Sequence, residues 1–330
     1  MRDPRWSRND VYFVFKGKGN KKVSDIFHVD FFRFLPKDKA SAVPMFYAKS
    51  CEVSKGKDEK MFAEAAAAAK KADVAVVVVG HDKSIAKEGR DRKNSISLPG
   101  VQEELVKTVY KANPKTIVIL VTGGPLAINW INDNVPAILC LHYGGQSQGT
   151  ATARAIFGDV NPAGKLTQTW FKSSEDLPDF KDYNIFNERT YMYFTGKPLY
   201  PFGFGLSYTK FSYNELKTSA KTVSPGKPLT IKVEITNKGT RKGDEIVQMY
   251  VRDIKSSAKM PKKALKGFTR ISLNPGKSEI VSLTLDYLDL SYWNAKLGKF
   301  VVEDGNIEIM VGASSEDIRL KNKIKTMKGK

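Results

Sequence analysis

Residues 72–102, ADVAVVVVGHDKSIAKEGRDRKNSISLPGVQ, decide the fold of the first part of the chain. An uninterrupted apolar run, Val74–Val79, ends at Gly80, and a polar loop follows before a helix that is expected to start after Pro99. A strand that is apolar throughout is typical of a parallel sheet covered on both faces. Ligands bind beyond the carboxyl ends of the strands in such sheets, so this loop is predicted to carry the chemistry.

The flanking sequence repeats the alternation of apolar strands and helices. MFAEAAAAAKKAD at 61–73 has the Ala, Glu and Lys content of a helix, and TIVILVT at 116–122 is again apolar throughout. The fold class is therefore predicted to be an α/β three-layer sandwich with a mostly parallel sheet. The expected elements are strands at 44–53, 74–79, 116–122 and 135–143 and helices at 61–73, 100–112 and 148–158.

A second pattern begins near Leu229, where apolar and polar residues alternate and turn signals such as NKG, NPG and EDG separate the runs. This period of two predicts an antiparallel, immunoglobulin-like β-sandwich of about 100 residues. Residues 164–213, between the two patterns, are rich in aromatic residues, Pro and Gly and show no helical period. A segment of that kind is usually functional or wraps a neighbour.

The first 36 residues follow neither pattern. DVYFVFK at 10–16 and VDFFRF at 29–34 predict two strands joined by a loop, and two strands do not form a stable domain alone. They either pair with the sheet that follows or are the remnant of a β-sandwich module. The predicted domains are therefore 1–36, 37–216 and 217–330.

The formal net charge of +19 raises the possibility of an anionic partner. Residues 217–330 hold 23 Lys and Arg against 12 Asp and Glu, an excess of +11, whereas 1–36 and 37–216 each have an excess of +4. The terminal run KNKIKTMKGK at 321–330 is expected to be a solvated tail. No patch interleaves Arg with aromatic residues, so no nucleic-acid partner is expected; a salt-sensitive binder of anionic polymers is a third interpretation.

Other features of the sequence limit the kinds of site that it can form. Cys51 and Cys140 are expected to be buried thiols, since two cysteines make no disulfide framework. The three histidines, His28, His81 and His142, are too scattered for a metal site, and no cofactor is expected. No apolar run approaches the roughly 20 residues of a membrane helix, and the start MRDPRWSRND lacks an apolar signal region, so no membrane partner is expected.

Glycine-rich turns follow two of the predicted strands. GGP at 123–125 lacks the G-x-G-x-x-G pattern of dinucleotide sites. GGQSQG at 144–149 precedes a helix and either presents N–H groups to a ligand or simply closes a tight turn from strand to helix.

Several long stretches, in order along the chain, resemble glycoside hydrolase family 3. KEGRDRKNSISLPGVQEELV, NPKTIVILVTGGPLAINW, GGQSQGTATARAIFGDVNPAGKLTQTW and RTYMYFTGKPLYPFGFGLSYTKFSY are similar to the C-terminal half of its β-xylosidase and β-glucosidase branch. LKGFTRISLNPG and IEIMVGASSEDIRL resemble the fibronectin type III-like domain that ends many members, and DVYFVFKGKG with VDFFRF resembles the last strands of a family 6 carbohydrate-binding module.

The resemblance implies a retaining β-glycosidase whose two carboxyl groups come from different domains. The nucleophilic Asp of the family lies on an N-terminal (β/α)8 barrel, for which this chain has no counterpart, so no nucleophile is expected here and the isolated chain is expected to be inactive. Glu88 matches the general acid/base, and Asp91 and Arg92 match a pair that orders the loop. His81 and Asp82, at the strand exit, either contact substrate or cap the loop.

The resemblance also sets the expected partners and location. The substrate is expected to be a β-linked oligosaccharide from plant polysaccharide, with xyloside, glucoside and arabinoside specificity all open, and the second partner is the barrel. The parent enzyme is expected to be secreted or periplasmic. The alternative from another class is a non-catalytic carbohydrate-binding or scaffold protein that reuses these domains. Several aromatic residues either stack on sugars or, as we favour, pack the long segment against its own domain and the next: Tyr191, Tyr193, Phe194, Tyr200, Phe202 and Phe204.

Overall fold

The computed structural model describes residues 46–51, 56–81, 85–86 and 95–327, together with the backbone of 11–14 and 33–36. The chain divides into two compact units, which are described separately. The first runs to Val160 and takes in Phe171–Asp176; the second consists of Asn161–Trp170 and Leu177–Lys330. The two predicted strands near the N-terminus pair as an antiparallel ribbon, β1 (Val11–Val14) with β2 (Arg33–Pro36).

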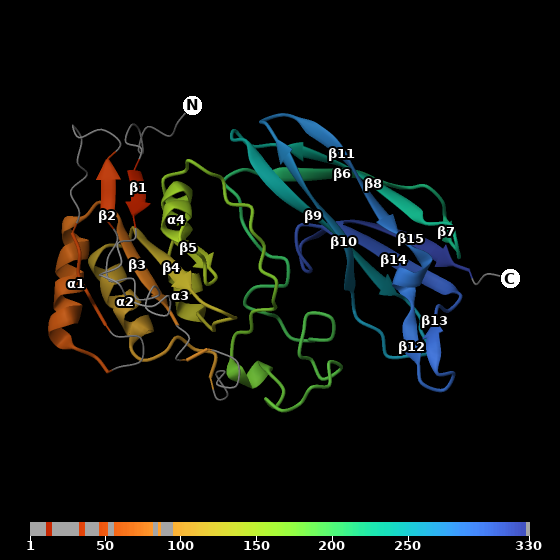
Figure 1. The fold of residues 1–330 in the computed structure, drawn as a ribbon, viewed down its shortest axis with the longest axis horizontal. Coiled ribbons are helices and arrows are strands. Elements are labelled where there is room, and N and C mark those ends of the chain that lie inside the picture. The colour runs from red at the N-terminus through yellow and green to blue at the C-terminus, as the bar shows by residue number, and fades with distance from the viewer. Residues whose placement is uncertain are drawn as a thin grey trace. The chain divides into compact units, whose positions relative to one another are not determined.

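A parallel three-stranded sheet, in the order β3-β4-β5, forms the centre of the first unit (Figure 1). Its strands are β3 (Ala75–Gly80), β4 (Thr116–Val121) and β5 (Ala137–Leu141), and they pair in the parallel sense. Val118, Ile119 and Leu120 of the central strand are fully buried. The uninterrupted apolar runs thus correctly predicted a parallel sheet.

Four helices in the described part of this unit follow or precede these strands. In α1, Asp58 caps the first turn by accepting hydrogen bonds from Lys60 N and Met61 N, and Phe62, Ala65 and Ala69 form the buried face. The helix predicted at 100–112 begins two residues later, and it packs on α1, β3 and β4. The helices are α1 (Glu59–Lys71), α2 (Gln102–Ala112), α3 (Asn129–Asn134) and α4 (Gln148–Ile156), with a 3-10 turn, η3, at Ser174–Asp176.

Two expectations for the first unit are wrong. No strand forms over 46–51, where Phe46 and Tyr47 are 48% and 55% exposed, so apolar side chains there have no sheet face to cover. Cys51 and Cys140 are only half-buried, and Cys140 lies on β5 at the edge of the described sheet. Burial is still sufficient to raise the pKa of Cys140 to about 11.

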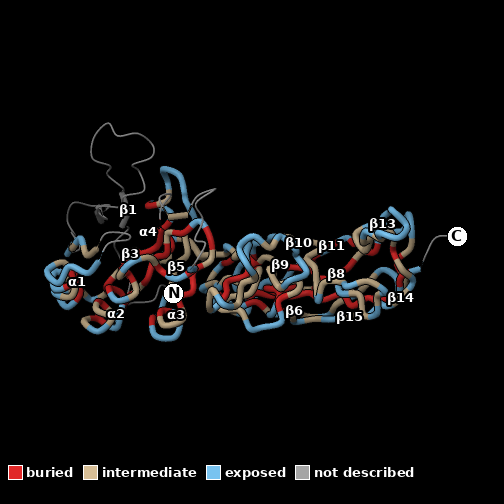
Figure 2. The backbone as a smooth tube through the Cα atoms, turned by 90° about the horizontal axis from the view of Figure 1, so that it is seen from below, coloured by how far each residue is buried: buried red, intermediate tan, exposed pale blue. Residues whose placement is uncertain are grey.

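The second unit is a β-sandwich, as the period-two alternation predicted. One sheet has the order β10-β9-β14-β15-β7 and the other the order β11-β8-β6, and their inner faces share one apolar core (Figure 2). Every described strand pair is antiparallel except β15 with β7. The strands are β6 (Phe211–Thr218), β7 (Thr222–Val223), β8 (Leu229–Asn237), β9 (Gly243–Asp253), β10 (Ala264–Leu273), β11 (Ser278–Leu285), β14 (Gly305–Gly312) and β15 (Ile318–Thr326).

A hairpin of β12 (Tyr292–Asn294) and β13 (Lys299–Val301) follows the 3-10 turn η4 (Tyr287–Leu290). The carboxylate of Glu303 ties this region to the sandwich: it accepts hydrogen bonds from Tyr292 OH at 2.6 Å, Ser257 N at 2.9 Å and the Ser257 hydroxyl. These bonds, with Ser257 contributing most, lower the pKa of Glu303 to about 2.

The terminal run 321–330 is not a solvated tail over its first six residues, which belong to β15. Leu320 and Ile324 lie against the core while Lys321, Lys323 and Lys325 are exposed. Only Ile324 among these six residues is apolar, so the composition of the run indicates a charged tail. The alternation of exposed lysines with the more buried Asn322, Ile324 and Thr326 is instead that of a half-buried strand.

The aromatic segment before β6 packs onto the sandwich and forms part of the second unit. Tyr191 stacks on Phe202 with ring centroids 4.4 Å apart, and Tyr200 stacks on Phe204 at 5.1 Å. Tyr191 also lies edge-on to Tyr250 of β9, with ring centroids 6.1 Å apart, which confirms for this ring the predicted packing on the following domain. Gly203, at φ +81°, approaches so closely that an added Cβ would lie 2.1 Å from Gln248 Oε1. Among the described residues, no helix is long and apolar enough to cross a membrane.

Candidate active site

The carboxyl end of β3 is fixed by a side chain that lies 22 residues away in sequence. Gly80 N donates to Gln102 Oε1 at 2.6 Å, and Gln102 Nε2 donates to Gly80 O at 2.8 Å, with Gln102 only 3% exposed. Gly80 has φ +146°, and an added Cβ would lie 1.9 Å from Val121 O of the neighbouring strand. Only glycine fits this position, so the chain leaves the sheet here in one fixed direction.

His81, the next residue, joins the carboxyl ends of all three strands. Its Nδ1 lies 2.9 Å from Tyr143 OH, which follows β5, and its Nε2 lies 2.9 Å from Thr122 Oγ1, which follows β4. Thr122 Oγ1 in turn donates to Gly124 O at 2.5 Å, and the His81 backbone N–H donates to Val121 O at 3.0 Å. His81 is 4% exposed, so its ring acts as a buried brace between strand ends.

Ile96 and Ser97, which follow residues 82–94 in the sequence, are also held by hydrogen bonds to other parts of this unit. Ile96 N donates to Ser174 Oγ at 3.1 Å, Ile96 O accepts from Ala127 N at 2.8 Å, and Ser97 forms a parallel bridge with Ala127. The side chains of Ile96 and Leu98 are buried. The described residues on either side of 82–94, His81 and Ile96, are therefore both held by hydrogen bonds to other parts of this unit, and His81 lies at the carboxyl edge of the sheet, where ligands bind in this class of fold.

Of the predicted site residues, the structure describes only His81. His81 lies in the brace; Asp82, Glu88, Asp91 and Arg92 lie outside the described residues, so their roles stay predictions. The sequence reasoning missed three residues that build the frame: Gln102, Thr122 and Tyr143. Thr122 and Tyr143 could have been found from the sequence, because each is a polar residue just after an apolar strand.

The glycine-rich turn at 144–149 lies at the same edge of the sheet. Gly144 N donates to Gln148 Oε1 at 3.0 Å, and Gln148 N donates to Gly145 O at 3.0 Å. An added Cβ at Gly123 would lie 2.9 Å from the Tyr143 ring. These contacts favour tight packing of the turns over ligand binding. Within the described residues no group of His, Cys, Asp or Glu is placed to hold a metal ion.

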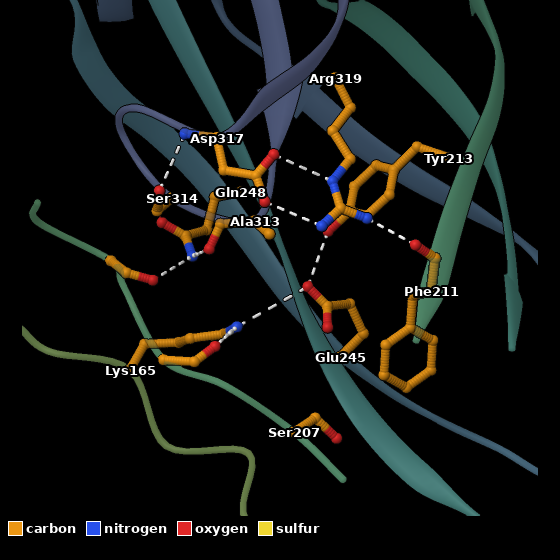
Figure 3. Close-up of polar contacts among 12 residues, drawn as sticks. Lys165, Ser207, Phe211, Tyr213, Glu245, Gln248, Ala313, Ser314, Asp317 and Arg319 are labelled. Atoms are coloured by element: carbon orange, nitrogen blue, oxygen red, sulfur yellow. Dashed lines mark hydrogen bonds and ion pairs between the residues drawn. The ribbon is translucent and has the colours of Figure 1, made fainter. Parts of the chain in front are cut away.

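A second polar cluster lies in the sandwich unit (Figure 3). Lys165 Nζ donates to Gly205 O at 2.8 Å and lies 3.8 Å from Glu245 Oε1, which also accepts from Tyr213 OH at 2.9 Å. Burial raises the pKa of Glu245 and lowers that of Lys165, and burial together with the Glu245 charge raises the pKa of Tyr213. The cluster fastens the aromatic segment to the strands beneath it.

Arg319 completes this cluster. Its guanidinium pairs with Asp317 at 2.8 Å, donates to Phe211 O and lies over the Tyr213 ring, 4.8 Å from its centroid. Arg319 is the extra residue of a β-bulge, since Gly312 pairs with Ile318 and Val311 with Leu320. The bulge turns Arg319 toward β6, away from the lysines that follow it on the strand. Its hydrogen bonds lower the pKa of Asp317.

Two known families match the two patterns of the sequence. The Glycosyl hydrolase family 3 C-terminal domain matches residues 15–208, and the Fibronectin type III-like domain matches residues 245–315. The first match extends past Val160 into the aromatic segment, which by its contacts belongs to the second compact unit.

Curated relatives are longer than this chain. A β-xylosidase of Formosa agariphila is 42% identical over 298 residues, which cover 89% of this chain and 41% of that protein. A periplasmic β-glucosidase of Salmonella typhimurium is 34% identical over 284 residues, covering 83% of this chain and 37% of that protein. The chain thus spans about two fifths of the length of these relatives.

A solved structure gives the same picture. The β-glucosidase of Kluyveromyces marxianus, crystallised in complex with glucose, superposes with a TM-score of 0.75 and 34% identity, covering 82% of this chain and 34% of that one. The family match includes the parallel sheet, the glycine-rich turns and the aromatic segment. The chain therefore belongs to glycoside hydrolase family 3, of which it carries the C-terminal α/β domain followed by a fibronectin type III-like domain.

Proposed function

We propose that this chain supplies the acid/base half of the active site of an exo-acting, retaining β-xylosidase or β-glucosidase, with Glu88 as the general acid/base. The observation that carries the proposal is the anchoring of the family-matched loop 82–94 at both ends, by His81 and by Ile96, on the carboxyl edge of the sheet. A loop held at two rigid points can present one carboxyl group in a reproducible place.

Retaining hydrolysis requires two carboxyl groups about 5 Å apart. In the first step the Glu88 carboxylic acid gives its proton to the leaving glycosidic oxygen while a carboxylate nucleophile attacks the anomeric carbon. In the second step the Glu88 carboxylate takes a proton from the water that displaces the nucleophile. Glu88 must therefore be protonated at the start of the cycle, which requires a pKa raised toward neutrality by a poorly solvated site.

The nucleophile comes from the part of the enzyme that lies outside this chain. The curated relatives are more than twice as long as the matched region, which leaves room for a barrel domain carrying an Asp. Without that domain the chain lacks the carboxylate that forms the glycosyl-enzyme intermediate, and Glu88 lacks the neighbourhood that raises its pKa. The isolated chain is accordingly proposed to be inactive.

The residues around Glu88 have supporting roles. Asp91 and Arg92 form a charge-assisted pair that orders the loop. His81 holds the loop at its origin, because both ring nitrogens lie at hydrogen-bond distance from hydroxyl groups of neighbouring strand ends. Asp82, the first residue of the loop, caps it or reaches the substrate. The substrate is a β-linked oligosaccharide. The parent enzyme acts in the periplasm or outside the cell; this part of the proposal is supported by the Salmonella relative, which is named a periplasmic β-glucosidase.

A chimera tests this proposal. The matched C-terminal region of the Formosa β-xylosidase is replaced by this chain, and hydrolysis of aryl β-xyloside and aryl β-glucoside is compared with that of the chain alone. Turnover by the chimera and none by the chain supports a shared active site. Turnover by the chain alone would contradict the proposal that the nucleophile lies outside this chain.

The same experiment addresses the non-catalytic alternative. A chimera that folds with the unfolding midpoint of the parent and binds xylo-oligosaccharides without cleaving them would indicate a binding or scaffold protein instead.

A further inference from the structure

Three lysines form a row on the outer face of the larger sheet of the sandwich. Lys321, Lys323 and Lys325 alternate along β15, all exposed, and their side chains share one face. Their cross-strand partners on β14 are Met310, Glu308 and Asn306. Alternate residues of a strand lie about 7 Å apart, so the lysine row (Lys321, Lys323 and Lys325) spans about 14 Å.

Little negative charge offsets this row. Glu308 is the directly opposed carboxylate, but it is 7% exposed and its Oε2 lies 3.1 Å from Arg252 Nη2, on the next strand of the same face. None of the three lysines has an ion pair within the described part of the chain. Unpaired like charges on one face are unfavourable in a sheet, and an anionic partner relieves that repulsion.

The outer face of the smaller sheet is balanced instead. Lys217 pairs with Glu215 at 2.7 Å, and Lys232 lies on the same strand face as Glu234. The positive charge of the C-terminal third is thus distributed unevenly between the two sheets. The unpaired lysine row lies on the outer face of the larger sheet, whereas the outer face of the smaller sheet carries charges of both signs.

A groove of about 370 Å³ begins at Lys321 and extends the row. It is lined by Arg252, Lys262, Lys263 and Lys321 together with two carboxylates, Glu308 and Glu316. Each carboxylate is already paired, Glu308 with Arg252 and Glu316 with Lys263 at 3.1 Å. The groove therefore carries a net positive charge of its own and continues the cationic surface in one direction.

We propose that the lysine row and this groove bind an acidic polysaccharide, a linear polymer that carries carboxylates on its sugar rings. A polymer can contact all three lysines and the groove at once, whereas a small anion contacts one or two of them. The choice of a saccharide over other polyanions rests on the proposed glycosidase function. The presence of the cationic surface is independent of that function. Bound polymer keeps the enzyme at a surface rich in its oligosaccharide substrates.

The neighbouring side chains disfavour nucleic acid and membrane. Single-stranded nucleic acid requires exposed aromatic faces beside the cations, but the two rings that line the groove are engaged: Phe194 is 8% exposed and Tyr191 is stacked on Phe202. Beside the row on β14 lie Met310, which is buried, and Asn306, and beyond its end Met327 is 54% exposed. A single exposed methionine is much less than the apolar face that binding at a lipid surface needs.

Lysines on an exposed edge strand can also serve only to prevent edge-to-edge aggregation. Beyond its short pairing with β7 at Lys325 and Thr326, β15 has no partner on that edge among the described strands, so this role must be separated from binding. Substitution by glutamate does so, because it keeps the edge charged while reversing the sign that a polyanion needs.

The test compares two triple variants of the full chain by affinity electrophoresis in gels containing polygalacturonate, neutral xylan or duplex DNA. K321E/K323E/K325E reverses the row, and K232E/K238E/K277E reverses three exposed lysines elsewhere in the same unit. Each variant lowers the formal net charge from +19 by 6 to +13, so bulk charge is matched. Size-exclusion chromatography and circular dichroism show that both variants remain monodisperse and folded.

We expect polygalacturonate to retard the wild-type chain and neutral xylan not to, with retardation lost as salt increases. The row variant should bind on the order of tenfold more weakly or worse, and the control variant should bind nearly as well as wild type. Equal loss in both variants, no retardation of the wild-type chain, or tighter binding to duplex DNA than to polygalacturonate would each overturn the proposal. Binding is measured without turnover, so an inactive chimera would refute the proposed hydrolase function and leave this result standing.

Discussion

The side-chain amide of Gln102 brackets the backbone of Gly80, accepting a hydrogen bond from its N–H at 2.6 Å and donating one to its carbonyl at 2.8 Å. This pair of hydrogen bonds joins the first residue of α2 to the last residue of β3, the two elements between which Glu88 lies in the sequence. Gly80 and Gln102 are both buried.

Gln102→Leu should lower the free energy of unfolding by about 2 kcal/mol or more, because it leaves a buried donor and a buried acceptor unpaired. The neighbouring substitution Glu103→Gln serves as the control: it removes an exposed i,i+4 ion pair with Lys107 and should cost less than about 0.5 kcal/mol. Urea unfolding followed by circular dichroism measures both. Equal effects of the two substitutions would show that this pair of hydrogen bonds contributes nothing specific.

Gly80→Ala should be more damaging still, because the added methyl group meets Val121 O at 1.9 Å in a backbone conformation that other residues avoid. We expect a loss of about 3 kcal/mol or more, or failure to accumulate folded protein. Gly145→Ala, with no atom within 4 Å of the added carbon, should change stability little. A Gly80→Ala variant as stable as Gly145→Ala would contradict the close approach of β3 to β4.

The ion pair beneath the aromatic segment predicts strong coupling between its members. Lys165→Met removes the ion-pair partner of the buried Glu245, which keeps its hydrogen bond from Tyr213 OH, so we expect a loss of about 3 kcal/mol. In the double variant Lys165→Met/Glu245→Gln neither charge remains. Its loss should be smaller than the sum of the two single losses, as a double-mutant cycle of unfolding free energies will show. Simple additivity would mean that the two side chains do not interact.

Glu303 predicts an acid-sensitive contribution to the stability of the sandwich. Its pKa in the folded chain is about 2, below the usual 4.5, so its contribution is complete above about pH 4.5 and is lost as the pH falls toward 2. After allowance for solvent screening we expect about 1 kcal/mol at pH 7.

Comparison of Glu303→Gln with wild type by urea unfolding between pH 7 and pH 2.5 tests this sign. The destabilisation should shrink as the pH falls, whereas Glu279→Gln, on an exposed position of β11, should show no such trend. A Glu303→Gln effect that is constant or grows at low pH would contradict the assigned hydrogen bonds.

Local patterns in the sequence predicted the regular elements well, because each depends on neighbours along the chain. The apolar run ending at Gly80 and the alternation in β8 are visible in short windows. Contacts between distant residues could not be predicted in this way. The residues near Gly80 do not indicate its hydrogen bonds with Gln102, and the composition of 321–330 does not indicate that Ile324 is buried. The strand expected at 44–53 was wrong over 46–51 because side-chain type alone does not supply a pairing partner.

The site shows the same division. The resemblance supplied Glu88, Asp91 and Arg92, which remain predictions, and the structure supplied the frame that holds their loop. His81 links the two, since it was named from its position after a strand and is found bonded to Thr122 and Tyr143.

Chemical rescue of Glu88→Gly in the chimera with the Formosa β-xylosidase tests the central claim most directly. With an aryl glycoside that has a poor leaving group, loss of the general acid should lower kcat by about 10²–10⁴-fold. With an activated leaving group the second step becomes limiting, and added azide should restore turnover and yield the β-glycosyl azide. Unchanged turnover of the poor substrate, or no azide product, would contradict the assignment of Glu88 as the general acid/base.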